Sequence, residues 1–558
     1  MGAGGAGLRA AVEALKQDVS VLIVSKSLLG KAHTVMAEGG IAASLGNVDK
    51  EDNWKVHFAD TYVEGVYLGD WRLVEKLAKD APERVLELEE FGALFDRSPE
   101  GKILQRAFGA HTYRRLCHVG DKTGLELIRT LQDKVLHSGA SFLEETMITK
   151  LVTDGKRVYG AIGFDLKKGN FVVISAKTVI MASGGLGRMF KVTSNSWEST
   201  GDGLSLAYEA GAELMDLEMV QFHPTGMLWP PAIRGLLVTE GVRGDGGLLF
   251  NAKGERFMLR YSPNKKELDA RDVVARSIYR EIMEGRGTEH GGVYLDISYK
   301  GAKYIMEKLP SMYMQFKEFS GVDITKEKME VAPTLHYHMG GIRIDPETNE
   351  TRMKGLFAAG EAASGVHGAN RLGGNSLADL LVFGKRTGES AAKYAAKVRE
   401  KEVNDSEVNA EIDRVLAFLN KPDGVNPFTL FERLRVALST NVGIWRDEEN
   451  LKKALAEVRQ IKKESLNVGV SGSTVFNPGL VTCLEINGMA SVAEMLVVAA
   501  IERKESRGAH YRLDYPNTDK SWRKNIIFTK DGNSYQMRTE PVPELPPELE
   551  ALLPKEAT

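Results

Sequence analysis

The stretch MGAGGAGLRAAVEALK, residues 1–16, decides the fold class. Gly2, Gly4 and Gly7 form a GxGxxG pattern that opens a helix, and VSVLIVSKS, residues 19–27, follows as an apolar strand. This order of glycine-rich loop, helix and strand is typical of a dinucleotide-binding fold, in which a pyrophosphate lies over the N-terminus of the helix. The sequence therefore predicts an α/β fold with a nucleotide site at its beginning.

Two features depart from the complete dinucleotide pattern. No strand precedes Gly2, and the second strand ends in Ser25 and Lys26, where an acidic residue often meets the ribose. The strand before the loop normally lies in the middle of the sheet, and each backbone group left unpaired there costs roughly 1–3 kcal/mol. We therefore expect the natural polypeptide to begin about ten residues upstream with a short apolar strand.

Composition excludes several classes of protein. A chain of 558 residues has room for several domains, and a net charge of −3 without a long basic run argues against a nucleic-acid partner. The two cysteines, Cys117 and Cys483, are too few for an iron–sulfur cluster, which generally needs about four. No HExxH or paired CxxC motif predicts a metal site. No uncharged apolar run reaches the ~20 residues of a membrane span, so we expect a soluble polypeptide.

A second glycine-rich stretch, HGANRLGGNSLADL, spans residues 367–380. Ser376 and Asp379 have the spacing of a capping box, which predicts a helix that starts at Ser376 and offers its positive end to an anion. Arg371 would lie over the same spot with a guanidinium suited to a carboxylate. Taken alone, these residues are more typical of a glycine-rich turn with a solvated arginine.

Further glycine-rich and polar sites follow along the first 216 residues. KAHTVMAEGGIAA, residues 31–43, carries His33 ahead of Gly39 and Gly40. A helix is predicted at 123–136, and residues 156–185 indicate a β-hairpin followed by a buried strand that ends at Gly184. Asp202 stands at the head of another predicted helix.

The pattern changes near residue 217. The next 120 or so residues are short of long helices and rich in cationic and hydrogen-bonding groups, which suits a dianionic substrate. A short apolar strand ends at Glu361. Beyond about residue 405 the chain is helical and charged, and from residue 508 it is irregular. Its Pro/Glu-rich end, 541–558, is predicted to be frayed or bound to a partner.

Eight motifs together resemble one family, the flavoprotein subunit of succinate dehydrogenase and fumarate reductase (complex II). They occur in the family's order, at about its spacing, over nearly the whole chain. The motifs are AHTVMAEGG (32–40), TGDG (200–203), QFHPTG (221–226), LVTEGVRGDGG (237–247), RDVVARS (271–277), PTLHYHMGG (333–341), HGANRLGGNSL (367–377) and ESRGAHYRLDYP (505–516).

The resemblance implies an α/β fold with a split, Rossmann-like FAD-binding domain at 1–216 and 337–404. An α+β capping domain is inserted at 217–336, a helical domain follows at 405–507, and an irregular C-terminal segment ends the chain at 508–558. It also implies FAD attached covalently through His33. Its further FAD contacts map onto Gly2, Gly4, Gly7, Ser25, Lys26, Thr34, Gly39, Gly40, Gly184, Asp202, Glu361, Ser376 and Leu377.

The reaction implied is the interconversion of succinate and fumarate by hydride transfer at the flavin. The family's carboxylate-binding residues match His223, Thr239, His336 and Arg371. Arg271 matches the proton donor and acceptor, with Glu240 and Arg243 as its relay. Because guanidinium normally stays protonated, an alternative is that Arg271 only stabilises charge while Glu240 or water moves the proton.

The partners implied are an iron–sulfur subunit and, through it, a membrane anchor that meets quinone or another carrier. This chain would then be peripheral to the membrane on its cytoplasmic side. Glu38, where some members carry glutamine, points faintly to fumarate reductases. Two other interpretations remain open: an L-aspartate oxidase, which normally lacks the covalent histidine, and a non-catalytic flavoprotein scaffold, which would not need the full set of substrate residues.

Overall fold

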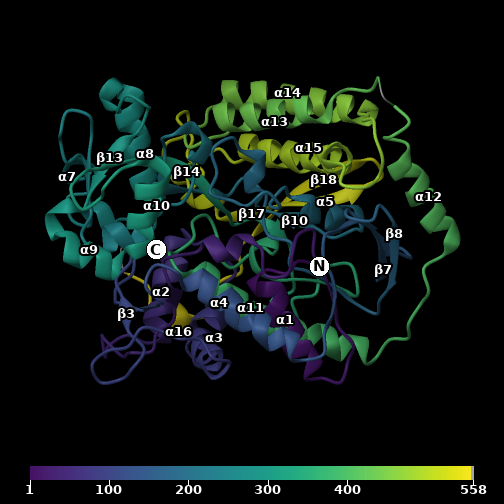
Figure 1. The fold of residues 1–558 in the computed structure, drawn as a ribbon, viewed down its shortest axis with the longest axis horizontal. Coiled ribbons are helices and arrows are strands. Elements are labelled where there is room, and N and C mark those ends of the chain that lie inside the picture. Colours follow the sequence, from purple (N-terminus) through teal and green to yellow (C-terminus); the bar gives the residue numbers. More distant parts are fainter. Residues whose placement is uncertain (422, 555–558) are drawn as a thin grey trace.

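Helices α1, Gly5–Leu15, and α11, Asn375–Ala395, pack side by side although they are far apart in the chain. This computed structural model describes residues 1–421 and 423–554. Gly384 and Gly388 of α11 face α1 so closely that a Cβ at Gly384 would lie 2.9 Å from the Cβ of Arg9, and one at Gly388 would collide with the carbonyl oxygen of Ala10. Backbone therefore packs on backbone along this pair, which Figure 1 shows in its lower part.

Two short parallel strand pairs lie beside these helices. Strand β1, Leu22–Val24, pairs with β5, Ser141–Leu143, and β9, Val179–Met181, pairs with β16, Leu356–Ala358. Met1 and Gly2 lie between the two pairs: the amide of Gly2 donates to the carbonyl of Val24, and the amide of Ala182 donates to that of Met1, both at 2.8 Å. The glycine-rich loop thus leaves the sheet at the carboxyl ends of its strands, where α/β folds bind ligands.

The elements predicted for residues 123–209 are confirmed. Helix α4 spans Thr123–Leu136, and strands β7, Val158–Asp165, and β8, Phe171–Ser175, form the expected antiparallel hairpin. Strand β6, Thr146–Thr153, completes this sheet, and α5, Asp202–Glu209, begins at the expected aspartate. Two further helices, α2 at Trp54–Glu64 and α3 at Trp71–Glu90, pack on each other, and α3 also packs on α11.

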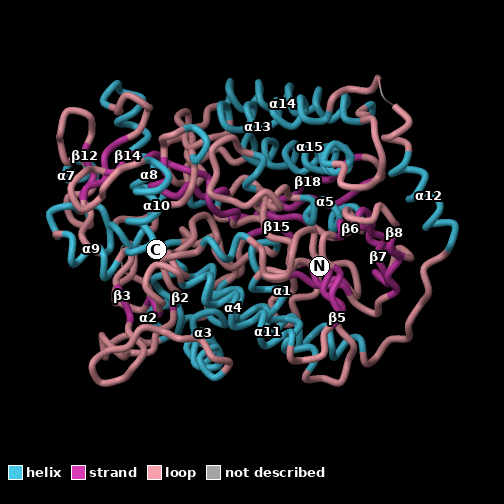
Figure 2. The backbone as a smooth tube through the Cα atoms, viewed as in Figure 1, coloured by secondary structure: helices cyan, strands magenta, loops and turns pink. Residues whose placement is uncertain are grey.

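An antiparallel sheet built from residues between Val220 and His338, in the order β11-β14-β13-β12, forms a layer within the region expected to be a capping domain. A distinct core that includes Val242, Phe257 and Leu295 lies under it. Figure 1 shows this layer on the left, and Figure 2 places its strands on the opposite side of the molecule from β6, β7 and β8. The elements are β11 (Val220–Met227), β12 (Leu248–Phe250), β13 (Val293–Asp296), β14 (Met329–His338), α8 (Arg271–Glu281) and α10 (Pro310–Ser320).

The helices α12, Asp405–Leu416; α13, Pro427–Asn441; α14, Glu448–Glu464; and α15, Pro478–Glu502, follow residue 404, and the short helix α16, Pro547–Glu550, lies near the end of the described chain. By length and composition alone α15 is long and apolar enough to cross a membrane, but 67% of its most apolar window is buried inside the protein. It packs against α13 and α14, as the top of Figure 1 shows. Its apolar character therefore follows from its place in the core.

The structure corrects the expectation of an irregular C-terminal segment. Strands β17, Lys524–Asp531, and β18, Ser534–Pro541, form a hairpin, and β17 joins a sheet with β10, Leu214–Met215. Its turn contains Gly532 at φ +57°, and an Asp-Gly turn between two strand-like runs was the missed signal. Residues 541–554, expected to be frayed or held by a partner, pack on α2 and α3 through Leu545 and Leu549. Residues 555–558 lie outside the described part.

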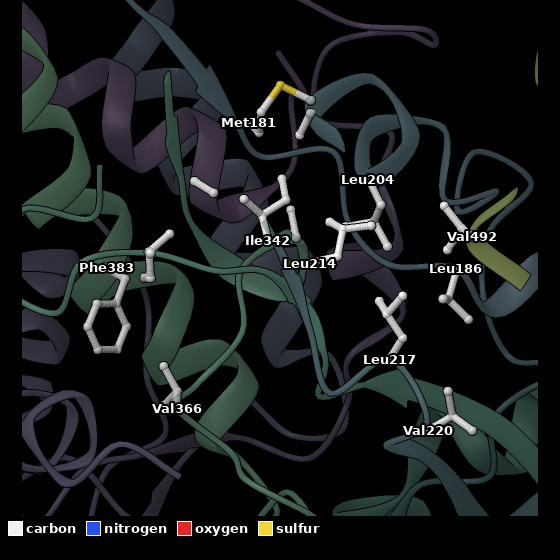
Figure 3. Packing of buried hydrophobic residues seen from close by; sticks show 14 of the residues in the cluster. Met181, Leu186, Leu204, Leu214, Leu217, Val220, Ile342, Val366, Phe383 and Val492 are labelled. Carbon is white, nitrogen blue, oxygen red and sulfur yellow. The ribbon is translucent and has the colours of Figure 1, made fainter. Parts of the chain in front are cut away.

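One core joins the elements around α5, β10 and α11 to the helices that follow residue 404. Figure 3 shows Leu204 of α5, Leu214 of β10 and Val492 of α15 in the same cluster, with Phe383 of α11 on its other side. All four side chains are at most 1% exposed. Burial of each such side chain stabilises the fold by roughly 1.5–3 kcal/mol, so α11 and α15 are fixed with respect to the same set of strands.

Candidate active site

A cleft with a void of about 1210 Å³ opens along the glycine-rich loop and the first turn of α11. It also contacts the end of β1 and the residues around His33. Most of the predicted cofactor contacts line it, together with His336. They are Gly2, Gly4, Ser25, Lys26, His33, Thr34, Gly184, Asp202, Glu361, Ser376 and Leu377.

Three of the predicted cofactor glycines do not line this cleft. Gly7 lies behind the loop, where a Cβ would collide with the carbonyl oxygen of Gly2, so its role is to let the helix pack on the loop. Gly39 and Gly40 line a smaller neighbouring cavity. Gly4 precedes α1 without a side-chain cap, and of the first N–H groups of that helix the amide of Gly5 donates to the hydroxyl of Thr34 at 3.3 Å. A helix N-terminus of this kind suits a pyrophosphate.

Lys26 closes one end of the cleft through a buried charge cluster. Its ammonium lies 2.8 Å from a carboxylate oxygen of Asp202 and 2.6 Å from one of Glu485, which comes from α15. Burial lowers the pKa of Lys26, but these two carboxylates outweigh it, and the net pKa is raised. The sequence interpretation missed Glu485; a glutamate within a buried apolar helix was the signal for a buried ion pair.

His33 stands at the wall of the cleft, at the start of a 3₁₀ turn, His33–Met36. Its Nε2 lies 3.1 Å from the amide nitrogen of Asn195, and its buried Nδ1 has no hydrogen-bond partner among the described residues. Burial, and then the charge of Arg371, lower its pKa to about 4. The imidazole is therefore neutral near pH 7, the form in which it has a nucleophilic lone pair.

The smaller cavity, with a void of about 360 Å³, adjoins the cleft and shares His336, Ser376 and Leu377 with it. It lies at the seam between the β11–β14 sheet and α11. All four predicted substrate-binding residues line it, as do Arg271 and Glu240. Its lining is completed by Ala37, Glu38, Gly39, Gly40, Phe108, Leu237 and Gly374.

Arg371 brings unsatisfied donors to this cavity. Its Nη1 lies 3.3 Å from the hydroxyl of Ser376, whereas Nε and Nη2 are buried with no hydrogen-bond partner in the described part of the chain. The guanidinium lies over the ring of Tyr337, 4.5 Å from its centre. Burial, then the neighbouring charge of Arg271, lower its pKa to about 9. A carboxylate would satisfy both the free donors and the charge.

Arg271, Glu240 and Arg243 form a continuous buried series. Nε of Arg271 lies 2.7 Å from Oε2 of Glu240, and Nη2 of Arg243 lies 3.6 Å from the same oxygen. The amide of Gly109 donates to the other oxygen of Glu240 at 2.8 Å. Burial raises the pKa of Glu240, but the two arginines outweigh it and the net pKa is lowered. Arg243 does not line the cavity; it lies behind Glu240.

The capping box predicted at Ser376 is wrong. Helix α11 begins at Asn375 after Gly374, which has φ +81°, and no side chain caps it. Ser376 instead accepts from Arg371, and Asp379 lies 3.0 Å from Nε2 of His367. Gly374 adopts this conformation because the loop passes so close to Leu116 that a Cβ would collide with its side chain. Because no side chain caps the N-terminus of α11, its first amides are more available to an anion than they would be in a capping box.

A β-bulge aims His336 at the site. Opposite Gln221 and Phe222 of β11, strand β14 has one extra residue, so the register shifts between Leu335 and Tyr337. The ring of His336 lies between those of His33 and His223, with centroids 5.9 and 5.2 Å away. Burial first lowers the pKa of His336 well below its usual value. Three neutral imidazoles thus run from the cleft into the cavity.

Sequence reasoning assigned no role to several residues of the site. Phe108 packs against Gly39, and Nε2 of His111 lies 2.7 Å from the carbonyl of Gly373. Both belong to QRAFGAHTYRR, a stretch whose helix-breaking glycine and two rings were the available signal. Glu38 is buried, and burial followed by the charge of Asp121 raises its pKa well above the usual value. Within the described residues, no group of three His, Cys, Asp or Glu side chains is arranged to hold a metal.

This chain is similar to known protein families over most of its length. The FAD binding domain family matches residues 1–377, and the family described as fumarate reductase flavoprotein C-term matches residues 431–549. A fumarate reductase (CoM/CoB) chain from Methanothermobacter marburgensis is 46% identical, with 95% of this chain and 96% of that protein covered. The succinate dehydrogenase flavoprotein subunit of Coxiella burnetii is 40% identical, with 96% and 94% covered.

Solved structures agree. Sdh1 of Mycobacterium smegmatis in complex with UQ1 is 48% identical, with a TM-score of 0.88 and 98% and 94% of the two chains covered. A quinol-fumarate reductase with menaquinol molecules is 36% identical, with a TM-score of 0.92 and 98% of each chain covered.

The fold and the cleft define an FAD-binding oxidoreductase. More closely, the chain belongs to the succinate dehydrogenase and fumarate reductase flavoprotein family, enzymes that act on CH–CH bonds. The family and the fold class predicted from the sequence are confirmed.

Proposed function

We propose that this chain interconverts succinate and fumarate at FAD bound covalently to His33, and exchanges electrons with a separate iron–sulfur subunit. The observation that carries the proposal is the shared wall of the two cavities. It brings His223, Thr239, His336 and Arg371, together with Arg271 and Glu240, against the cleft that fits FAD.

The residues of the cleft fit FAD on three observations. Gly4 gives α1 no side-chain cap, although the amide of Gly5 donates to Thr34; the hydroxyl of Ser183 and Nδ1 of His33 are buried without partners in the described chain; and the N-terminus of α11, also without a side-chain cap, lines the same space through Ser376 and Leu377. Bound there, FAD would supply two-electron oxidation and reduction of a carbon–carbon bond. His33 would hold it covalently, and α11 would stabilise negative charge near Ser376 and Leu377.

Two carboxylates of a C4 substrate find complementary groups at the two sides of the small cavity. Arg371 offers two free donors for one carboxylate. The neutral rings of His223 and His336 and the hydroxyl of Thr239 offer hydrogen bonds without adding charge. Glu240 is neutralised by Arg271 and Arg243, so the remaining positive charge of the site is available to the substrate dianion.

Proton transfer would be the work of Arg271, which lines the substrate cavity and is re-supplied through Glu240 and Arg243. An arginine acid requires surroundings that disfavour positive charge. Burial lowers the pKa of the two neighbouring arginines, Arg243 and Arg371. The competing role, charge stabilisation by Arg271 with Glu240 or water moving the proton, predicts substantial residual activity without it.

Partner subunits follow from the cysteine count. Cys117 and Cys483 are buried free thiols far apart in sequence, and an iron–sulfur cluster generally needs about four thiolates. Electrons would therefore pass to a separate iron–sulfur subunit and from it to a membrane anchor and quinone or another carrier. The chain would then be peripheral to a membrane, at its cytoplasmic face.

Acid precipitation of the purified protein tests the covalent bond, because covalent flavin stays in the pellet. Turnover is measured with succinate and an oxidising dye, and with fumarate and a reduced viologen. Retained flavin and turnover of both dicarboxylates support the proposal. Oxygen uptake with L-aspartate and no succinate turnover would indicate the oxidase alternative, and no turnover of any dicarboxylate would indicate the scaffold.

A further inference from the structure

Asn370, the residue before Arg371, is a buried junction of hydrogen bonds and is 1% exposed. Its Oδ1 accepts from Nε2 of Gln221 at 2.7 Å. Its Nδ2 donates to Oε1 of Glu64 at 2.7 Å and to Oδ1 of Asp272 at 2.9 Å. Every hydrogen-bonding atom of this amide is therefore used, so the side chain has one orientation.

Gln221 extends the junction to both active-site arginines. Its Nε2 also donates to the carbonyl oxygen of Arg371 at 2.8 Å, and its Oε1 accepts from Nη1 of Arg271 at 3.4 Å. Gln221 belongs to β11, whereas Arg271 begins α8 and Arg371 lies before α11. One amide thus connects the two guanidinium-bearing segments across the seam of the cavity.

Glu64 lies at the end of this series of hydrogen bonds that is opposite to the two arginines. It is the last residue of α2 and 9% exposed. The next residue, Gly65, accepts from the amide of Ala369 at 2.9 Å, and Gly368, at φ +56°, packs directly on the same turn. The C-terminal turn of α2 and the loop before Arg371 therefore meet backbone to backbone, with the Glu64 side chain as their link to Asn370.

The surroundings of Glu64 disfavour its charged form. Burial and then the charge of Asp272 raise its pKa well above the usual value; Glu240 adds to this, while Lys265 and Arg271 oppose it. The negative end of the α2 dipole acts in the same direction. Asn370 bridges the two acidic side chains, because its Nδ2 donates to both Glu64 and Asp272.

Residues of the motif ESRGAHYRLDYP (505–516) also contact the segments that meet at this junction. Arg276 of α8 lies 2.6 Å from Asp272, and the same nitrogen donates to the carbonyl of Gly508 at 2.8 Å. The amide of Ala509 donates to the carbonyl of Ala369 at 2.9 Å. Helix α8 and the Arg371 loop are thus tied to one turn of the C-terminal segment.

We propose that Glu64 is a positioning residue which, through Asn370 and Gln221, fixes Arg271 and Arg371 at the spacing that a C4 dicarboxylate requires. This rests on the proposed function. This series of hydrogen bonds is not a proton route, because its two middle members, Asn370 and Gln221, are amides, which carry no titratable proton at neutral pH. Its effect is on geometry. A displacement of active-site groups by about 1 Å costs up to 10²-fold in rate.

Three variants of the FAD-loaded, assembled enzyme test this role. Glu64→Leu removes the acceptor at nearly constant volume, Glu64→Gln keeps a neutral acceptor, and Glu90→Leu is the control. Glu90 is also the last residue of its helix, α3, but it is exposed. We expect Glu64→Leu to lower kcat about 10-fold, equivalent to about 1.4 kcal/mol. It should also raise the Kd for malonate, measured by flavin absorbance, with flavin content and Tm unchanged.

Glu64→Gln should stay within about twofold of wild type, and its pH–rate profile should match. Equal losses in Glu64→Gln and Glu64→Leu, or an unaffected Glu64→Leu, would overturn the positioning role. A loss in the Glu90 control of the same size would do so as well. If Glu64→Leu does not assemble, Glu64→Ala removes the same acceptor and is judged by the same criteria. A wild-type enzyme inactive with both dicarboxylates contradicts the proposed function instead, which separates the two failures.

Discussion

Arg271 and Glu240 share a hydrogen bond of 2.7 Å in a place where neither side chain has appreciable contact with solvent. Glu240 is further held by the backbone of Gly109 at 2.8 Å and by Arg243. Both side chains line the small cavity, but each oxygen of Glu240 already accepts a hydrogen bond, one from Arg271 and one from Gly109. In the proposed function, Arg271 is the member of this pair that meets the substrate.

Arg271→Ala should remove nearly all turnover with succinate and with fumarate, because the variant lacks the proposed proton donor. Chemical reduction of the flavin should be unaffected. Steady-state assays with artificial electron carriers measure the first, and dithionite titration the second. Activity above about a tenth of wild type, a loss of only about 1.4 kcal/mol, would favour the charge-stabilising role over proton donation.

His33→Ser should leave FAD bound but extractable by acid, since the cleft retains its helix N-termini and hydrogen-bonding groups. Succinate oxidation should fall more than fumarate reduction, because a bond to the flavin ring raises its tendency to accept electrons. Fluorescence of the acid-precipitated pellet gives the flavin distribution. Flavin that stays with the precipitated variant would show that the attachment site lies elsewhere.

Arg371→Ala should abolish dicarboxylate binding, because the substrate carboxylate would be buried without its partner. We expect the Kd for malonate to rise by at least about 100-fold, about 2.7 kcal/mol, in a titration of flavin absorbance. Arg386→Ala is the control: this arginine lies within α11, the helix that follows Arg371, and pairs with Asp80. A Kd for Arg371→Ala equal to that of the control would refute the assignment.

Buried histidines should make the protein sensitive to mild acid. Burial lowers the pKa of His57 to about 3 and that of His338 to about 4, whereas an unfolded histidine titrates near 6.5. The unfolded chain therefore binds more protons below pH 6.5, and the free energy of unfolding falls as pH falls. Between pH 6.5 and 5.5 each such group costs roughly 1 kcal/mol.

Thermal or denaturant unfolding followed by circular dichroism over this pH window measures the effect. His338→Gln, which keeps a donor for the carbonyl of Leu217, should flatten the pH dependence by about one group. His137→Gln, at an exposed position of the same residue type, should leave it unchanged. Identical pH slopes in wild type and His338→Gln would contradict the prediction.

The sequence was sufficient where local chemistry decides. GxGxxG predicted α1 and its cleft, and the residues around 123–209 formed the elements expected of them, because glycine placement and apolar periodicity act over a few residues. The candidate substrate residues come from four distant segments, and only their motifs, not their spacing, indicated that they would meet. The structure brings them to one cavity.

The failures have physical causes as well. The capping box at Ser376 lost to a tertiary demand: the approach of Leu116 leaves room only for a glycine in the left-handed conformation at position 374. The junction of Glu64, Asn370 and Gln221 has no local pattern, since each residue belongs to a different element and its partners are fixed only by packing. The C-terminal hairpin was missed because β18 is largely polar, with alternating exposure that masks its pairing with β17.

The contact between α1 and α11 determines which substitutions the enzyme can accept far from its chemistry. Gly388 lies 13 positions after Asn375, or about 20 Å along the helix axis. A glycine within a helix costs roughly 0.5–1 kcal/mol relative to alanine, so alanine would be favoured at Gly384 and Gly388 by helix propensity alone. Methyl groups added at these two positions would push α11 away from α1 and move the N-terminus of α11, where the sequence predicts that an anion binds. Substitutions at Gly384 and Gly388 are therefore expected to affect the active site through the packing of α11 on α1, although neither position lines the cleft or the smaller cavity.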